Sequence, residues 1–215
     1  MLVDDVVVLC DFDGTISVKD VTDSLLERFA NPEWEQLEED WQEGLISSHE
    51  CMAGQYALIK ADQEEVESFL GRVQIDPYFT QFVEHCNNKG FTLAIISDGF
   101  DFYIERILNN NNIEGIEVFA NHLEWQEGSV KTFFPHINND CRTCGNCKTS
   151  IFHKFKKPGN KVIYVGDGWS DRCIAQQSDI IFAKGKLTKF CHENGVSYIP
   201  YLSFLDIIKE TSELS

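Results

Sequence analysis

The sequence has 215 residues, enough for one domain with an insertion but short for two independent domains. Its 43% hydrophobic and 25% charged residues exclude a disordered chain. The formal net charge of −17 repels phosphate backbones and anionic membranes, so neither nucleic acid nor a membrane is an expected partner. No apolar stretch nears the roughly 20 residues of a membrane span. The acidic start lacks a signal-peptide pattern, which predicts a cytoplasmic protein.

Three apolar runs are typical of strands buried on both faces of a parallel sheet. They are residues 6–10, 91–96 and 162–165. Polar residues and glycine follow each run directly, at the strand ends where open α/β sheets bind ligands. Further strands are expected at 180–182 and 196–199, and helices are expected from Asp76-Pro77 to Gly90 and up to Ile208. This alternation predicts an α/β fold, a doubly wound Rossmann-like and mostly parallel sheet.

Residues 17–75 interrupt this alternation with four successive helix signatures and no strand. The expected helix starts are Asp20, Asn31-Pro32, Ser47 and Asp62. The sequence therefore predicts a small helical cap at 17–75, inserted into a core of residues 1–16 and 76–215. Apolar stripes on these helices are predicted to be cap core, including Trp34, Leu37, Trp41 and Leu45. The segment holds 14 acids and 4 bases, so −10 of the net charge falls here.

Two carboxylates follow the first strand, in Asp11-Phe12-Asp13-Gly14-Thr15. Side chains this close repel each other when ionised, and hard oxygen ligands favour magnesium as the cation that offsets the repulsion. Asp167 and Asp171 follow another predicted strand, in Gly166-Asp167-Gly168-Trp169-Ser170-Asp171. Because the carboxyl ends of parallel strands share one sheet edge, these acids are expected to complete the same metal site.

These motifs resemble those of the haloacid dehalogenase superfamily of aspartate-nucleophile phosphohydrolases. Residues 11–15 are similar to its first motif, Ser97-Asp98-Gly99 to its second, Lys148 to its third, and residues 166–171 to its fourth. The resemblance implies a magnesium-dependent phosphatase acting on a small phosphorylated metabolite. The alternatives are a phosphotransferase or sugar-phosphate mutase with the same intermediate and, in a different class, a non-catalytic metal or redox sensor on a phosphatase scaffold.

The resemblance also implies a role for each motif residue. Asp11 attacks phosphorus to form an aspartyl-phosphate, while Asp13 protonates the leaving oxygen and then activates water. The implied metal site comprises Asp11, the backbone carbonyl of Asp13, Asp167 and, as a ligand or a brace, Asp171. The implied substrate-binding groups are Thr15, Ser97, Asp98, Gly99 and Lys148.

The motif lysine has two candidates. Lys148 opens a helical pattern and lies 19 residues before Asp167, so a helix and a strand can bring it to the same sheet edge. Lys131 is the alternative.

A helical insert after the first motif resembles the phosphoserine-phosphatase-like branch. The run Cys144-Gly145-Asn146-Cys147-Lys148 and the C-terminal tail resemble the methionine-salvage enol-phosphate phosphatases and the phosphocholine and phosphoethanolamine phosphatases. An enol-phosphate with a methylthio tail would need apolar cap side chains, for which the sequence offers Phe29, Trp34, Trp41, Met52, Tyr56 and Phe69. Phosphoserine, phosphocholine or phosphoethanolamine would instead place a cation near Asp20 and the acidic cap.

The eight cysteines are expected to be reduced. The run Cys141-x-x-Cys144-x-x-Cys147 suggests a structural zinc site, against free thiols or a reversible disulfide in a surface loop. The remaining cysteines are predicted to be small buried hydrophobes: Cys10, Cys51, Cys86, Cys173 and Cys191. Residues 120–147 show weak periodicity and suggest a long connection, with hairpin character near Trp125–Gly128.

Overall fold

The fold was examined in a computed structural model that describes residues 5–126, 129–138 and 144–214. The sheet has the strand order β4-β3-β2-β1-β5-β6-β7 and is parallel except for the β3–β4 pair. Its strands are β1 (Val6–Cys10), β2 (Thr92–Phe100), β3 (Glu117–Gln126), β4 (Ser129–Phe133), β5 (Lys161–Gly166), β6 (Ile180–Ala183) and β7 (Ile199–Pro200). The predicted α/β class and mostly parallel sheet are confirmed.

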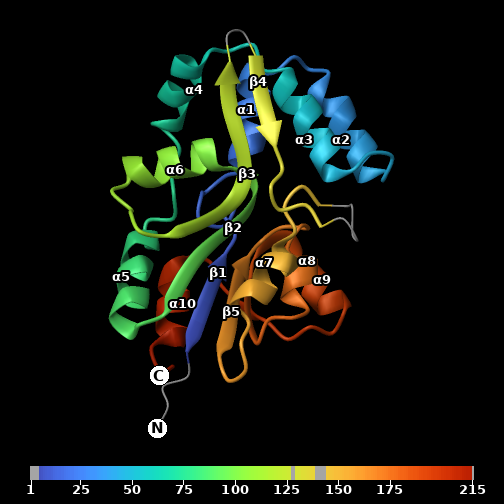
Figure 1. The fold of residues 1–215 in the computed structure, drawn as a ribbon. Helices are drawn as coiled ribbons and strands as arrows, with labels where there is room; N and C mark the ends of the chain where they lie inside the picture. Colours follow the sequence, from blue (N-terminus) through green and yellow to red (C-terminus); the bar gives the residue numbers. More distant parts are fainter. Residues whose placement is uncertain (1–4, 127–128, 139–143, 215) are drawn as a thin grey trace.

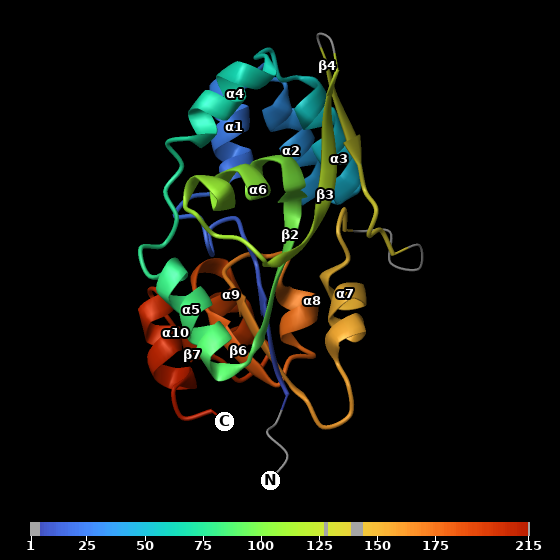
Figure 2. The ribbon, with the colours of Figure 1, turned by 60° about the vertical axis from the view of Figure 1, so that its left-hand side comes forward.

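Both faces of the sheet are covered by helices, because both faces of its strands are apolar. Val6, Val8 and Cys10 of β1 pack in one core with α5 (Phe79–Lys89), α6 (Asp101–Asn110) and α10 (Phe204–Thr211). Val7 and Leu9 point the other way, into a core with α7 (Lys148–Phe155), α8 (Arg172–Ala175) and α9 (Gly185–Glu193). Figure 2 shows these two helical layers on either side of the strands.

Four helices lie between β1 and β2 in the sequence: α1 (Val21–Phe29), α2 (Trp34–Gln42), α3 (Ser48–Ala57) and α4 (Gln63–Leu70). They gather at the end of the molecule opposite the termini, beside the β3–β4 hairpin (Figure 1). The side chains of Asp20, Ser47 and Asp62 accept hydrogen bonds from the first turns of α1, α3 and α4, as the sequence predicts. None of the described helices is long and apolar enough to cross a membrane.

Several predicted elements are wrong in detail. The second strand does not end at Ile96, since β2 continues through Ser97-Asp98-Gly99 to Phe100 with a register shift against β3. The last strand spans only Ile199–Pro200, and Asp76 does not cap α5 directly but accepts a hydrogen bond from the Tyr78 amide. β3 replaces the predicted loop, because half of this strand projects beyond the parallel sheet and lacks regular alternation of buried residues.

Two predictions about burial are also wrong. Leu45 lies beyond the end of α2 with 68% of its surface exposed, so it is not cap core. Cys173 is exposed at the start of α8, whereas Cys10, Cys51, Cys86 and Cys191 are buried as predicted. Both exposed residues lie on the wall of one hollow between α2 and the loop after β5, and this position explains why they are not packed in a core. The hairpin is confirmed by the pairing of Gln126 with Ser129.

Candidate active site

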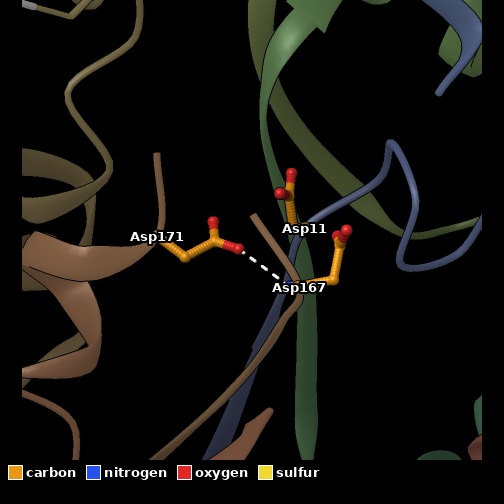
Figure 3. Close-up of side chains that lie close together, drawn as sticks. All are labelled: Asp11, Asp167 and Asp171. Atoms are coloured by element: carbon orange, nitrogen blue, oxygen red, sulfur yellow. Dashed lines mark hydrogen bonds between the residues drawn. The ribbon is translucent and has the colours of Figure 1, made fainter. Parts of the chain in front are cut away.

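The carboxyl ends of β1, β2 and β5 bring the predicted motifs to one sheet edge. β1 lies between β2 and β5, so the turns after these strands are neighbours. Oxygen atoms of Asp11, Asp167 and Asp171 all lie within 4.8 Å of one another. Figure 3 shows Asp11 at the end of the first strand, facing the loop that carries the other two acids. Among the described residues, no other group of acids, histidines or cysteines has this metal-binding arrangement.

Asp11 is held in a buried, directed position. The amide of Phe12 donates to Asp11 Oδ1 at 2.8 Å, and Lys148 Nζ lies 2.8 Å from Asp11 Oδ2. The turn then reverses through Gly14, whose φ of +68° suits glycine, and a Cβ there would lie 2.6 Å from Asp167 Oδ2. Glycine is therefore required for the first and fourth motifs to come this close.

Lys148 rather than Lys131 lies at the site. Its side chain is 3% exposed, and Nζ lies 2.6 Å from Asp171 Oδ1 as well as beside Asp11. Burial opposes the charged ammonium, but the carboxylates of Asp11, Asp171 and Asp98 raise the pKa of Lys148 well above its usual value. Lys131 lies on β4, with Nζ over the Phe133 ring.

Asp171 has no free oxygen for a ligand, because both carboxylate oxygens are fully bonded. Oδ1 accepts from Lys148 Nζ at 2.6 Å and from Tyr164 OH at 2.5 Å. Oδ2 accepts from the amides of Asp167 at 3.0 Å and Gly168 at 2.9 Å. Of the two roles that the sequence left open, the geometry therefore favours a brace that fixes the lysine and the 167–168 backbone.

The site carries more negative charge than its lysine offsets. Burial and the neighbouring Asp171 carboxylate raise the pKa of Asp11, although Lys148 lowers it. Burial also raises the pKa of Asp167, whose Oδ1 accepts a hydrogen bond from Thr15 Oγ1 at 2.7 Å. A divalent cation that prefers oxygen ligands fits this arrangement, because it would allow both acids to ionise together.

Asp13 has an environment different from that of Asp11. Its Oδ1 accepts from the amide of Val21, the first residue of α1, at 2.9 Å, and its Oδ2 accepts from Tyr103 OH at 2.5 Å. Burial and the Asp20 carboxylate raise the pKa of Asp13 to about 8, against the lowering effect of these hydrogen bonds. Asp13 is therefore largely protonated at neutral pH, which is the state that a general acid needs.

The second motif occupies the register shift in β2. Ser97 is buried, with Oγ 2.9 Å from the Gly99 amide and 3.4 Å from Asp13 Oδ2. Asn146 donates from its amide to Asp98 Oδ1 at 3.2 Å and from Nδ2 to Ser97 O at 2.7 Å. Asn121 on β3 also binds this segment, through a 2.6 Å hydrogen bond to Asp98 O.

Sequence reasoning missed several supporting residues: Asn121, Asn146, Tyr103 and Tyr164. Asn146 alone had a nearby signal, its position two residues before Lys148.

A cavity of about 660 Å³ opens above these residues. Its floor includes Asp11, Asp13 and Asp167, and its far wall comes from α1 to α3. Of the six apolar cap side chains considered for a substrate tail, Trp41 and Met52 line the cavity, and Phe29, Trp34, Tyr56 and Phe69 do not. A second hollow of about 760 Å³ continues outward from Trp41 and Trp169, which belong to both walls.

Acidic side chains form one side of this cavity. Asp20, Asp23 and Glu38 all line it. Burial and the Asp23 carboxylate raise the pKa of Asp20 to about 6, and burial and Glu38 raise the pKa of Asp23. Asp20 Oδ1 also caps α1 by accepting from the Asp23 amide at 2.9 Å. The cavity is therefore acidic at both its catalytic floor and its α1 side.

The predicted zinc site has no support. Cys141 lies outside the described residues. Cys147 is buried at the start of α7, where its sulfur accepts a hydrogen bond from Ser150 Oγ, and Cys144 lies on the wall of the outer hollow. His136, considered as a fourth ligand, packs its ring against Phe119. Neither described cysteine belongs to a potential metal group among the described residues.

Comparisons with known proteins agree with this geometry. The family described as Putative Phosphatase matches residues 6–188. A 2-hydroxy-3-keto-5-methylthiopentenyl-1-phosphate phosphatase of an Exiguobacterium species is 30% identical over 204 residues, which cover 93% of this chain and 94% of the relative. The enzyme of the same name from Geobacillus kaustophilus is 32% identical over 206 residues, covering 94% and 93%.

Solved structures show the same fold. A phosphoserine phosphatase described as a phospho-aspartyl intermediate analogue superposes with a TM-score of 0.72 at 21% identity, covering 96% of this chain and 99% of that chain. A substrate-bound phosphoserine phosphatase complex gives a TM-score of 0.72 at 21% identity, covering 98% and 99%. At this identity the likeness concerns the arrangement of the chain, and the chemistry is argued from the residues.

Proposed function

Because the chain belongs to the Putative Phosphatase family and is a phosphoric monoester hydrolase of the haloacid dehalogenase superfamily, we propose that it uses Asp11 as a nucleophile, with magnesium, on a small phosphomonoester. The observation that carries this proposal is the pairing of two unlike acids on one turn. Asp11 lies beside the Lys148 ammonium, and Asp13 is held in a site that favours its protonated form.

The proposed reaction has two steps. Asp11 Oδ attacks phosphorus while the bond to the ester oxygen breaks, and Asp13 gives its proton to that oxygen. Asp13 then takes a proton from water, whose oxygen attacks phosphorus, and the bond to Asp11 breaks to release phosphate. Lys148 and the Ser97 hydroxyl are placed to hold the remaining phosphoryl oxygens, with Thr15, Asp98 and Gly99 shaping the same turn region.

Asp11, the backbone carbonyl of Asp13, and Asp167 would hold the metal, with Asp171 bracing Lys148 and the Asp167 backbone. When bound, magnesium would reduce the repulsion between the carboxylate floor and the dianionic phosphate and stabilise charge on the transferring group. Thr15 would keep one oxygen of Asp167 turned toward the site.

Removal of divalent metal is expected to lower the phosphatase rate by more than about 100-fold, because Lys148 alone does not offset the acids on the cavity floor. The measurement is 4-nitrophenyl phosphate hydrolysis after EDTA treatment, before and after magnesium is added in excess of the chelator. Calcium serves as the control, since it takes more ligands at longer distances and is not expected to restore the rate. Full activity in the chelated protein would contradict the metal assignment.

For the substrate, we propose the enol-phosphate 2-hydroxy-3-keto-5-methylthiopentenyl-1-phosphate, the compound named in the relatives at 30–32% identity. The cavity volume suits a small phosphorylated metabolite, and Trp41 and Met52 supply apolar walls for a methylthio tail. We also propose that residues 17–75 act as a cap, since α1 to α3 supply the wall opposite the catalytic floor. Exclusion of water by this wall would protect the aspartyl-phosphate until Asp13 activates one water.

A second substrate class is favoured by the acidic side of the cavity. Asp20, Asp23 and Glu38 would attract the ammonium group of phosphoserine, phosphocholine or phosphoethanolamine. A phosphotransferase or mutase reaction would use the same intermediate, and a test for acceptor-dependent transfer separates it from hydrolysis.

A substitution at Asp20 is expected to separate the two substrate classes. If the substrate carries an ammonium group, Asp20→Asn should raise its KM about tenfold and leave 4-nitrophenyl phosphate unaffected, since Asn keeps the helix cap but removes the charge. If the enol-phosphate is the substrate, the KM should stay within about twofold. The matched control is Asp62→Asn, which changes the equivalent cap of α4 away from the cavity.

The rates are to be read from a screen of small phosphomonoesters with magnesium. A specificity constant for the enol-phosphate no better than for generic phosphates would contradict the methionine-salvage substrate and leave the phosphatase mechanism standing.

A further inference from the structure

A line of buried hydroxyl groups runs from Asp13 into the helices. Tyr103 OH, on α6, donates to Asp13 Oδ2 at 2.5 Å. Thr22 Oγ1, on α1, lies 3.1 Å from Tyr103 OH and 3.2 Å from Tyr56 OH, on α3. Both tyrosine side chains are buried, with 0% and 1% of their surface exposed, so their hydroxyls depend on these partners. The line therefore connects one carboxyl oxygen of Asp13 to three separate helices.

The two oxygens of Asp13 are not equivalent. Oδ1 accepts from the Val21 amide, a backbone donor fixed at the start of α1. Oδ2 is approached by Ser97 Oγ at 3.4 Å, from a residue on the cavity wall, and so is the oxygen on the reacting side. Its one short hydrogen bond comes from Tyr103. Without that hydroxyl, only the long contact from Ser97 would limit rotation of the carboxyl group.

The Tyr103 ring is itself fixed by packing. It lies 6.1 Å from the Phe12 ring, which is buried at the first motif, and the Gly99 backbone passes directly against its hydroxyl. A Cβ at Gly99 would meet the Tyr103 hydroxyl and would also lie 2.7 Å from Asp13 Oδ2. The second motif thus leaves room for this hydrogen bond by having glycine at position 99.

We propose that Tyr103 is a positioning residue, which holds Asp13 Oδ2 in the orientation needed to protonate the leaving oxygen. The inference rests on the proposed function, in which Asp13 is the general acid. Tyr103 acts through Asp13, and Thr22 fixes the tyrosine hydroxyl from α1. A phenylalanine at 103 would keep the ring packing but lose the hydrogen bond, so the proposal concerns a single oxygen atom.

The test compares two leaving groups that differ in their need for a proton. Phenolate is far more basic than 4-nitrophenolate, so phenyl phosphate depends more strongly on the general acid. The constant kcat/KM covers the steps up to alcohol release and excludes the later hydrolysis of the phosphoenzyme. Tyr103→Phe is expected to lower kcat/KM for phenyl phosphate about 10- to 100-fold and for 4-nitrophenyl phosphate less than about threefold. Equal losses, or no loss, would overturn the proposal.

Tyr56→Phe is the matched control, because it removes a buried hydroxyl that also contacts Thr22 but does not touch Asp13. It is expected to change both substrates equally and by less than about threefold. A selective loss as large as that of Tyr103→Phe would overturn the role of the direct contact. Should Tyr103→Phe not fold, Thr22→Val removes the partner of the tyrosine hydroxyl and is expected to show a weaker selective loss; equal effects on both substrates would again overturn the proposal.

Asp13→Asn separates this inference from the function on which it rests. If Asp13 is the general acid, the variant loses phenyl phosphate hydrolysis selectively and more strongly than Tyr103→Phe. A selective loss in Asp13→Asn without one in Tyr103→Phe overturns the positioning role alone. No selectivity in Asp13→Asn overturns the acid assignment and the inference with it.

Discussion

Replacing Asp11 with asparagine is expected to lower phosphatase activity by at least about 10⁴-fold, because an amide oxygen does not form the aspartyl-phosphate. The measurement is single-turnover and steady-state hydrolysis of 4-nitrophenyl phosphate with magnesium. Acid-quenched protein should also lose the covalently bound phosphate that the wild-type chain carries during turnover. A variant that keeps near wild-type activity would show that another group attacks phosphorus.

The fold of this variant should persist. Burial and the neighbouring acids raise the pKa of Asp11, so its charged form costs stability at neutral pH and an amide is not expected to lower the melting temperature without metal. Asp167→Asn is the matched control, since it removes one carboxylate from the same cluster but keeps the nucleophile. Excess magnesium should partly restore Asp167→Asn and leave Asp11→Asn inactive.

Replacing Lys148 with methionine is expected to impair both stability and catalysis. The ammonium lies 2.8 Å from Asp11 Oδ2 and 2.6 Å from Asp171 Oδ1, and its side chain is 3% exposed. Its loss leaves two buried carboxylates without their cation, which costs about 3–5 kcal/mol in the free energy of unfolding. The rate should fall about 100-fold or more, since Asp171 and the phosphoryl oxygens both lose a charged partner. Urea denaturation in EDTA and steady-state kinetics with magnesium give the two values.

Lys156→Met at the opposite end of α7 is the control for this variant. Lys156 Nζ pairs with Asp179 Oδ2 at 2.7 Å, but its side chain is 33% exposed. Its loss should cost under about 1 kcal/mol and leave the rate unchanged, because water screens an exposed pair. A Lys148→Met protein as stable and active as Lys156→Met would contradict the buried role of Lys148.

The sequence determined the sheet and the first and fourth motifs, because those signals are local. β1 and β5 are apolar at nearly every position, and each is followed at once by acids and glycine. Helix capping is also local, which explains why Asp20, Ser47 and Asp62 were found at the correct helix starts. The superfamily followed from these features, and the comparisons confirm it.

Only the tertiary structure decided between residues with equal local signals. Lys131 and Lys148 are both lysines before the fourth motif, and the crossover of α7 and β5 places just one of them beside Asp11. Asp167 and Asp171 are both acids, but bonding to the lysine and the backbone leaves Asp171 as a brace. Tyr103 carries no motif, since its contact with Asp13 spans 90 residues. Such long-range contacts depend on how separate elements pack, and no short segment of the sequence records that packing.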